Sequence, residues 1–164
     1  MKRVLEQKLR NIKLIVTDFD GVWTDGKVFV DENGRESVLC SRKDTLRLKE
    51  VRALGIDVCI ISKERNPVVK LRCKKMSVQY LQGVDDKRTE LLALLDSKKL
   101  TLGQVAFVGD DINDLACLAI VSVPITVNDA DPRCKAVAHY VTVRNGGDHA
   151  MREVFDLVLS VQGK

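Results

Sequence analysis

Residues 12–26 read IKLIVTDFDGVWTDG, and the other elements of the chain are interpreted from this stretch. The apolar residues between positions 12 and 16 predict a buried strand. Two carboxylates, Asp18 and Asp20, follow the strand, and Gly21 then permits a turn. In open parallel α/β sheets ligands bind at the carboxyl ends of the strands, and Mg²⁺ prefers carboxylate oxygens. The stretch therefore predicts a magnesium site with a nucleophile beside it.

A pair of aspartates with this spacing also occurs in solvated turns, so the pair alone decides little. Three further elements follow in order: a strand ending in a hydroxyl, a lysine that opens a helix, and a strand ending in acids within VAFVGDDIND. The residues concerned are Ser62, Lys87, Asp110, Asp111 and Asp114. Together the four elements resemble the motifs of the haloacid dehalogenase superfamily of phosphatases that use an aspartate nucleophile, and the resemblance covers nearly the whole chain.

Length and composition predict one well-buried domain over residues 1–164, with 45% hydrophobic residues. The first ten residues, MKRVLEQKLR, are charged throughout and lack the apolar centre of a signal peptide. No run approaches the roughly 18 apolar residues that span a bilayer. We expect a cytoplasmic protein without a membrane partner.

The five cysteines are odd in number, widely spaced and without a CxxC pair. This spacing argues against a disulfide framework and against a zinc site, so we expect reduced structural thiols. The net charge of +4 comes from basic residues spread along the chain. We therefore expect no nucleic-acid partner, whereas a small anionic substrate suits the positive excess.

Strands and helices alternate from end to end, which predicts an α/β fold with a doubly wound parallel sheet of five or six strands. Residues 1–11 are expected to form a frayed basic terminus. After the first strand we expect helices over 43–54, 66–76, from 87, over 112–118, after an Asn128 cap, and over 149–162, with strands over 56–61, 78–81, 105–108, 121–125 and 140–143.

A β-hairpin is predicted directly after the first strand. Residues 27–31 and 35–40 flank the turn DENG, in which Gly34 supplies a positive φ. Larger haloacid dehalogenase phosphatases insert a cap domain at this point or later, and this chain has too few residues for one. Val28, Val30, Val38 and Cys40 would form an apolar side that a lone hairpin cannot bury.

The resemblance implies a two-step phosphoryl transfer. Asp18 would attack phosphorus and form an aspartyl-phosphate. Asp20 would protonate the leaving alkoxide, then deprotonate the hydrolytic water, and its backbone carbonyl would face the metal. Asp18 and Asp110 would supply carboxylate ligands to Mg²⁺.

By the same resemblance, the remaining motif residues would stabilise the charge of the phosphoryl group or position the groups that do so. Ser62 and Lys87 would donate to the phosphoryl oxygens. By resemblance, Asp114 orients Lys87 or a metal-bound water. Capping of the helix near Ile112 is an equally good interpretation for Asp111 and Asp114.

Within the superfamily, DFDGVWTDG followed by a hairpin, QGVDDK, GDDINDL and RNGGDHAMREV look like the capless phosphatases of 2-keto-3-deoxy sugar acids. That family includes 3-deoxy-D-manno-octulosonate 8-phosphate phosphatases and relatives acting on nonulosonate 9-phosphates of the sialic-acid type. The resemblance implies a homotetramer in which hairpins of four subunits form a central barrel and a neighbour's surface serves as the cap.

The same resemblance suggests which residues contact the sugar. They are Thr24, Asp44, Glu64, Lys75, Gly146, Gly147 and Arg152. The chain departs from the family at Asp148 and His149, where an Arg-Gly pair is usual, and at Lys63-Glu64, where octulosonate phosphatases commonly read Gly-Arg. The latter difference favours nonulosonate 9-phosphates such as those of KDN or N-acetylneuraminate, with octulosonate 8-phosphate as the alternative. Pairing of Glu64 with Arg65, or capping of the next helix, is the structural alternative for Glu64.

A different class of function is a non-catalytic assembly domain, because a similar domain follows the catalytic part of some acylneuraminate cytidylyltransferases. Asp18, Asp20, Lys87 and Asp110 are all present here, and unpaired charges gathered at one sheet edge would repel without a catalytic use. This favours an enzyme. A receiver-type domain is disfavoured because its lysine should follow the phosphorylated acid near the C-terminus.

Overall fold

A computed structural model describes residues 2–163, and its centre is a six-stranded parallel sheet. The strand order is β5-β4-β1-β6-β7-β8. The strands are β1 (Leu14–Thr17), β4 (Asp57–Ser62), β5 (Gln79–Gln82), β6 (Val105–Gly109), β7 (Val123–Thr126) and β8 (Tyr140–Val141). The chain builds outward from β1 on one side and then on the other, so the sheet has its topological switch point beside β1.

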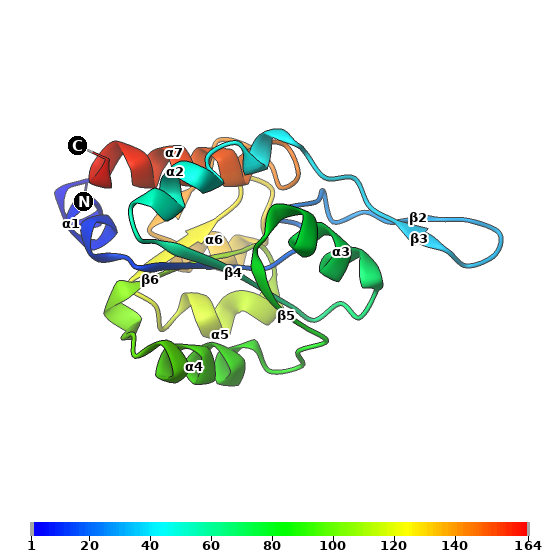
Figure 1. Cartoon of the computed structure of the whole chain (residues 1–164), viewed down its shortest axis with the longest axis horizontal. Coiled ribbons are helices and arrows are strands. Elements are labelled where there is room, and N and C mark those ends of the chain that lie inside the picture. Colours follow the sequence, from blue (N-terminus) through cyan, green and yellow to red (C-terminus); the bar gives the residue numbers. More distant parts are fainter. Residues whose placement is uncertain (1, 164) are drawn as a thin grey trace.

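Helices cover both faces of this sheet, which confirms the doubly wound fold. In Figure 1, α2 (Leu48–Ala53) and α7 (Ala150–Gln162) lie above the sheet, whereas α4 (Lys87–Lys98) and α5 (Leu115–Leu118) lie below it. The central strands β1 and β6 are buried along their whole length. Two covered faces explain why both strands read as continuous apolar runs rather than alternating ones.

The other helices are α1 (Lys2–Asn11), α3 (Pro67–Met76) and α6 (Pro132–Val137). The expected start of α3 is confirmed: the Asn66 side chain accepts a hydrogen bond from the Val68 N–H, and proline occupies the first helical position. Among residues 2–163, no helix has the length and apolar character needed to cross a membrane.

The hairpin is present and consists of β2 (Phe29–Val30) and β3 (Glu36–Ser37), which pair antiparallel. It projects from the body as a long arm beyond the carboxyl ends of the strands (Figure 1). No cap domain is present among the described residues. The absence of a cap agrees with the sequence expectation and leaves the carboxyl edge of the sheet open in one chain.

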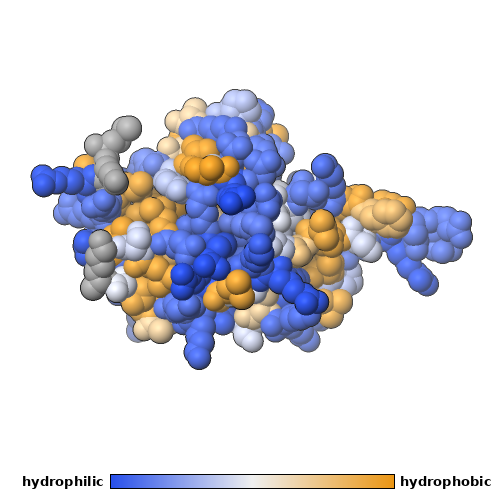
Figure 2. Space-filling model, turned by 90° about the horizontal axis from the view of Figure 1, so that it is seen from above, coloured by the Kyte–Doolittle hydropathy of each residue, from blue (hydrophilic) through white to orange (hydrophobic). Residues whose placement is uncertain are grey.

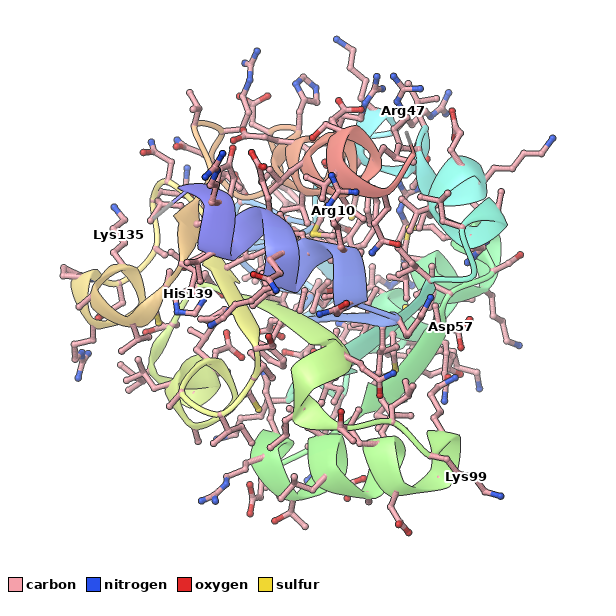
Figure 3. The ribbon with its side chains drawn as sticks, turned by 90° about the vertical axis from the view of Figure 1, so that its left-hand side faces the viewer. Arg10, Arg47, Asp57, Lys99, Lys135 and His139 are labelled. Atoms are coloured by element: carbon pink, nitrogen blue, oxygen red, sulfur yellow. The ribbon has the colours of Figure 1, made fainter. Side chains whose placement is uncertain are left out.

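The expectation of a frayed N-terminus is wrong, because residues 2–11 form α1, which packs against α7. Leu9 is fully buried, and the Gln162 side chain donates to the backbone oxygens of Leu9 and Ile12. Figure 3 shows α1 lying across the end of the sheet opposite to the hairpin, where Asp57 begins β4. The apolar spacing of Leu5 and Leu9 explains this docking, since both side chains reach the core.

Two further helix boundaries differ from the prediction. Asp131, not Asn128, caps α6 by accepting from the Arg133 N–H, while the Asn128 amide donates to Asn145. The helix expected over residues 43–54 is divided into a 3-10 turn at Lys43–Thr45 and α2. Asp44, in that turn, accepts a hydrogen bond from the Arg152 N–H, a distant contact that local patterning does not reveal.

Candidate active site

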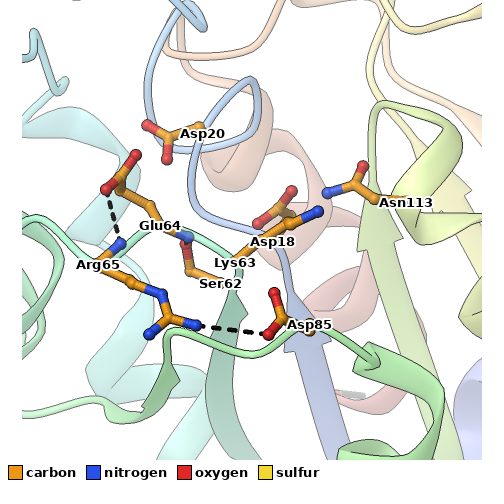
Figure 4. A pocket seen from close by; sticks show the side chains of 8 residues that line it. All are labelled: Asp18, Asp20, Ser62, Lys63, Glu64, Arg65, Asp85 and Asn113. Atoms are coloured by element: carbon orange, nitrogen blue, oxygen red, sulfur yellow. Dashed lines mark hydrogen bonds and ion pairs between the residues drawn. The ribbon is translucent and has the colours of Figure 1, made fainter.

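The carboxyl ends of β1, β4 and β6 and the start of α4 bring the predicted catalytic groups to one edge of the sheet. A pocket of about 450 Å³ opens there. It is lined by Asp18, Asp20, Ser62, Lys63, Glu64, Arg65, Asp85 and Asn113, as Figure 4 shows. Three of the four residues predicted to be catalytic line this pocket, and the fourth, Lys87, contacts Asp18 from behind.

Lys87 is buried between two carboxylates. Its Nζ lies 2.6 Å from Asp18 Oδ2 and 2.8 Å from Asp114 Oδ1. Burial opposes the charge of Lys87, but Asp18 and Asp114 outweigh it and raise the pKa of Lys87 above its ordinary value. The ammonium therefore stays charged beside Asp18, and Asp114 contacts it from the other side.

Backbone and buried polar groups fix Asp18. The Phe19 N–H donates to Asp18 Oδ1 at 2.7 Å, and the Thr17 hydroxyl donates to the Asp18 backbone oxygen. The Trp23 indole N–H in turn donates to Thr17. Burial and the charge of Asp114 raise the pKa of Asp18 to about 7, against the lowering effect of Lys87. The Asp18 carboxylate is thus held on both oxygens, while burial and the nearby Asp114 disfavour its ionised form.

Three carboxylates are placed to hold a cation: Asp18, Asp110 and Asp114 each offer an oxygen within 4.8 Å of the others. Asp110 Oδ1 is buried and has no hydrogen-bond partner within residues 2–163. Burial and then Asp18 raise the pKa of Asp110 to about 8. An orphaned buried carboxylate oxygen next to a second carboxylate fits a divalent cation such as Mg²⁺.

The acids after β6 divide into different roles. Asp114 Oδ1 accepts from Lys87 and its Oδ2 accepts from the Asp110 N–H, so both oxygens are engaged within the protein. Asp111 accepts from the Ile112 N–H and caps the 3-10 turn that begins there. Asp110, whose Oδ1 has no partner among the described residues, is therefore the carboxylate best placed as a direct metal ligand, whereas the two Asp18 oxygens contact the Phe19 N–H and Lys87.

Gly21 makes room for this site. Its φ is +76°, and a Cβ on this residue would overlap the Asp110 carboxylate. Gly21 therefore lets the loop after β1 come close to the loop after β6, in addition to permitting the turn.

Asp20 is half-buried at the pocket wall, close to Thr24. The Thr24 hydroxyl lies 3.4 Å from Asp20 Oδ1 and accepts from the Gly21 and Gly26 N–H groups. Burial and then the charge of Glu64 raise the pKa of Asp20. A raised pKa favours the protonated acid that a departing alkoxide requires. Thr24 itself is fully buried, and its hydroxyl holds the loop through these hydrogen bonds.

Ser62 and Glu64 lie at the end of β4. Ser62 Oγ is buried at the pocket wall and accepts from the Glu64 N–H at 3.1 Å. Glu64 Oε1 accepts from the N–H groups of Arg65 and Asn66. Glu64 therefore holds the loop backbone before α3 and lines the pocket, whereas Asn66 caps α3 and the Arg65 side chain pairs with Asp85.

Within residues 2–163, six of the seven residues expected to contact the sugar do not line this pocket: Thr24, Asp44, Lys75, Gly146, Gly147 and Arg152. Asp44 is fully buried beneath α7, and the Arg152 side chain pairs with Asp156 at 2.8 Å. The Asp44 carboxylate and the ion pair between Arg152 and Asp156 both stabilise the start of α7. Within one chain these two residues pack at the start of α7, and their contact with the sugar stays a prediction.

Lys75 and the two glycines occupy other places. Lys75 lines a second groove, of about 570 Å³, together with Arg42 and Arg72. The Gly147 N–H donates to the Val22 oxygen, and a Cβ on Gly146 would overlap the Gly21 oxygen. The tail therefore packs backbone to backbone against the loop that carries Asp20.

Four pocket residues were missed by the sequence analysis: Lys63, Arg65, Asp85 and Asn113. Each lies within three positions of a motif residue, and this closeness in sequence is the signal that could have identified them. Arg65 spans two loops, since its guanidinium lies 3.4 Å from Asp85 Oδ2 (Figure 4).

The comparisons with known proteins agree with this geometry. The pattern of the family described as haloacid dehalogenase-like hydrolase matches residues 63–151. The chain is 33% identical over 161 residues to 3-deoxy-D-manno-octulosonate 8-phosphate phosphatase KdsC of Haemophilus influenzae, covering 98% of this chain and 89% of that protein.

Solved structures show the same likeness. The Moraxella catarrhalis 3-deoxy-D-manno-octulosonate 8-phosphate phosphatase, in complex with magnesium, phosphate and KDO, is 32% identical with a TM-score of 0.95, covering 99% of this chain and 94% of that one. A cobalt-bound Haemophilus influenzae phosphatase is 33% identical with a TM-score of 0.91, covering 96% and 93%. The chain therefore belongs to the haloacid dehalogenase-like hydrolases.

Proposed function

We propose that this protein is a Mg²⁺-dependent phosphomonoesterase that removes phosphate from a 2-keto-3-deoxy sugar acid, with 3-deoxy-D-manno-octulosonate 8-phosphate as the first candidate. The observation that carries the proposal is the buried Lys87 ammonium between Asp18 and Asp114, beside the orphaned Asp110 oxygen. The named phosphatases that this chain resembles over nearly its whole length support the choice of substrate.

Asp18 Oδ attacks phosphorus, the bond between phosphorus and the ester oxygen breaks, and Asp20 gives its proton to the departing alkoxide. Asp20, now ionised, takes a proton from water as that water attacks the aspartyl-phosphate and frees Asp18. Lys87 keeps Asp18 oriented, and Ser62 donates to a phosphoryl oxygen. Asp18, Asp110 and the Asp20 backbone carbonyl would hold Mg²⁺, whose positive charge would stabilise the phosphoryl oxygens.

A second candidate substrate is a nonulosonate 9-phosphate, and one observation favours it. Glu64 lines the pocket and stands close enough to Asp20 to raise its pKa. A carboxylate there can accept hydrogen bonds from sugar hydroxyls, which a longer polyol chain supplies in greater number.

We also propose a homotetramer built on the hairpin, with a neighbour closing the open pocket. Phe29 and Leu39 are 71% and 77% exposed, and Val30 is 54% exposed. Figure 2 shows apolar side chains along the projecting arm. Such a surface is unfavourable in water unless another subunit covers it. The five cysteines are free thiols, which fits a reducing compartment such as the cytoplasm.

A phosphate-release assay with Mg²⁺ tests this function. The panel contains octulosonate 8-phosphate, a nonulosonate 9-phosphate and a hexose phosphate. We expect kcat/KM for one of the sugar acids to exceed that for the hexose phosphate at least tenfold. Absence of release from every substrate would favour the non-catalytic assembly domain instead.

Glu64→Arg separates the two sugar acids. If Glu64 contacts the sugar, the ratio of kcat/KM should shift toward octulosonate 8-phosphate in the variant. An unchanged ratio would assign Glu64 to loop capping alone, through its bonds to Arg65 and Asn66.

A further inference from the structure

Three successive side chains after Ser62 spread to different sides of the pocket. In Figure 4, Glu64 points toward the wall formed by Asp20, Arg65 points toward Asp85, and Lys63 extends toward the side formed by Asn113. All of them line the same pocket. The loop after β4 therefore presents three charged groups around the place where a phosphate would meet Asp18.

The electrostatics of this pocket oppose an anionic substrate. Asp18, Asp20, Glu64 and Asp85 line it, while Asp110 lies beside Asp18. A phosphate monoester is a dianion at neutral pH, so it must approach a group of carboxylates. Even with a divalent cation at Asp18 and Asp110 and a proton on Asp20, Glu64 keeps its side of the pocket negative, which makes a nearby cation valuable for binding.

Two of the three positively charged side chains at this site already form ion pairs within the protein. Lys87 contacts both Asp18 and Asp114, and Arg65 pairs with Asp85. Lys63 makes no ion pair with any residue between 2 and 163, although it lines the pocket. Its ammonium is therefore the positive group at the mouth that can meet an incoming anion without first breaking a protein contact.

We propose that Lys63 is a substrate-binding residue whose ammonium contacts the outer oxygens of the phosphoryl group. The inference rests on the proposed phosphatase function but not on the identity of the sugar. A flexible lysine at the rim adds attraction to the bound dianion and to the transition state alike. It should therefore act on KM and leave kcat almost unchanged.

Lys63→Met tests this proposal, because methionine keeps most of the apolar stem and removes the charge. Lys63→Arg is the conservative variant. Lys13→Met is the matched control, since Lys13 is exposed and directly precedes β1 at the opposite end of the sheet. Two quantities are measured for all variants in Mg²⁺: the steady-state constants for p-nitrophenyl phosphate, and the Kd of inorganic phosphate by calorimetry.

We expect Lys63→Met to raise both KM and the phosphate Kd about tenfold, which corresponds to one charge-assisted contact. The variant kcat should stay within about threefold of wild type. Lys63→Arg should recover most of the affinity, and Lys13→Met should behave as wild type. Because Lys63 acts through charge, added salt should weaken phosphate binding more steeply in wild type than in Lys63→Met.

The outcomes separate this inference from the proposed function. A wild-type protein that neither hydrolyses p-nitrophenyl phosphate nor binds phosphate would contradict the phosphatase assignment itself. An active wild type with unchanged KM and phosphate Kd in Lys63→Met would overturn the role of Lys63 alone. A fall in kcat with unaltered affinity would also contradict it, since that pattern indicates a disturbed Ser62 rather than a lost cation.

Discussion

Lys87 Nζ lies 2.6 Å from Asp18 Oδ2, so the first side chain of α4 touches the residue expected to attack phosphorus. Asp114 holds the same ammonium from the other side. The three groups are buried together, so removing Lys87 would leave two buried carboxylates without their cation. Lys87 is therefore expected to contribute to the stability of the folded protein as well as to catalysis.

Lys87→Met should lower kcat by at least about a thousandfold and destabilise the metal-free protein by about 3 kcal/mol, because it leaves two buried carboxylates facing each other. Urea unfolding and phosphate release measure the two effects. Lys98→Met is the control, since Lys98 pairs with the exposed Asp57 and its loss should cost under about 1 kcal/mol. Equal destabilisation by both variants would contradict this account.

The stability of the metal-free protein should fall as pH rises from about 4 to 8. The folded-state pKa values of Asp18 and Asp110 are raised to about 7 and about 8 from 3.8, so the folded state binds more protons than the unfolded state in this window. Mg²⁺ should remove the penalty, because it replaces the protons. We expect Mg²⁺ to raise Tm at least twice as much at pH 8 as at pH 5. Equal shifts at the two pH values would indicate that these carboxylates do not hold the ion.

The hairpin should hold the subunits together. Phe29→Lys combined with Leu39→Lys places charges on its most exposed apolar positions and should convert a tetramer into monomers. Light scattering checks the mass, and activity should fall with assembly if a neighbour closes the site. Lys27→Ala on the same arm serves as the control. A wild-type protein that is active as an 18.3 kDa monomer would contradict the proposed tetramer.

The alternation of strands and helices was predictable from the sequence because the central strands are buried on both faces and read as apolar runs. Asp18, Asp20, Ser62 and Lys87 were predictable for a similar reason: each lies at the end of a strand or the start of a helix, where parallel topology fixes its location.

Contacts between distant segments were not predictable in this way. Asp44, which the resemblance places near the sugar, accepts from the Arg152 N–H under α7, more than a hundred positions along the chain. Gly146, in the tail loop, packs on Gly21. The α1 helix was missed because its stability comes from docking on α7 rather than from its own charged sequence.

Asp18→Asn should abolish turnover while leaving the fold intact, because the amide has almost the same volume but neither attacks phosphorus nor carries a ligand charge. We expect kcat to fall by at least about a thousandfold. The circular dichroism spectrum should match that of wild type. A variant retaining a tenth of wild-type activity would exclude Asp18 as the nucleophile.

Trapping the covalent intermediate tests the mechanism most directly. In Asp20→Asn the water that cleaves the intermediate loses its base, whereas p-nitrophenolate still leaves unaided, so the aspartyl-phosphate should accumulate. Acid quenching, borohydride reduction and peptide mass spectrometry then convert and locate the acyl phosphate. The account predicts homoserine at position 18 in Asp20→Asn and none when Asp18→Asn is added. Phosphate release by an Asp20→Asn enzyme that never yields homoserine at position 18, or yields it elsewhere, would contradict it.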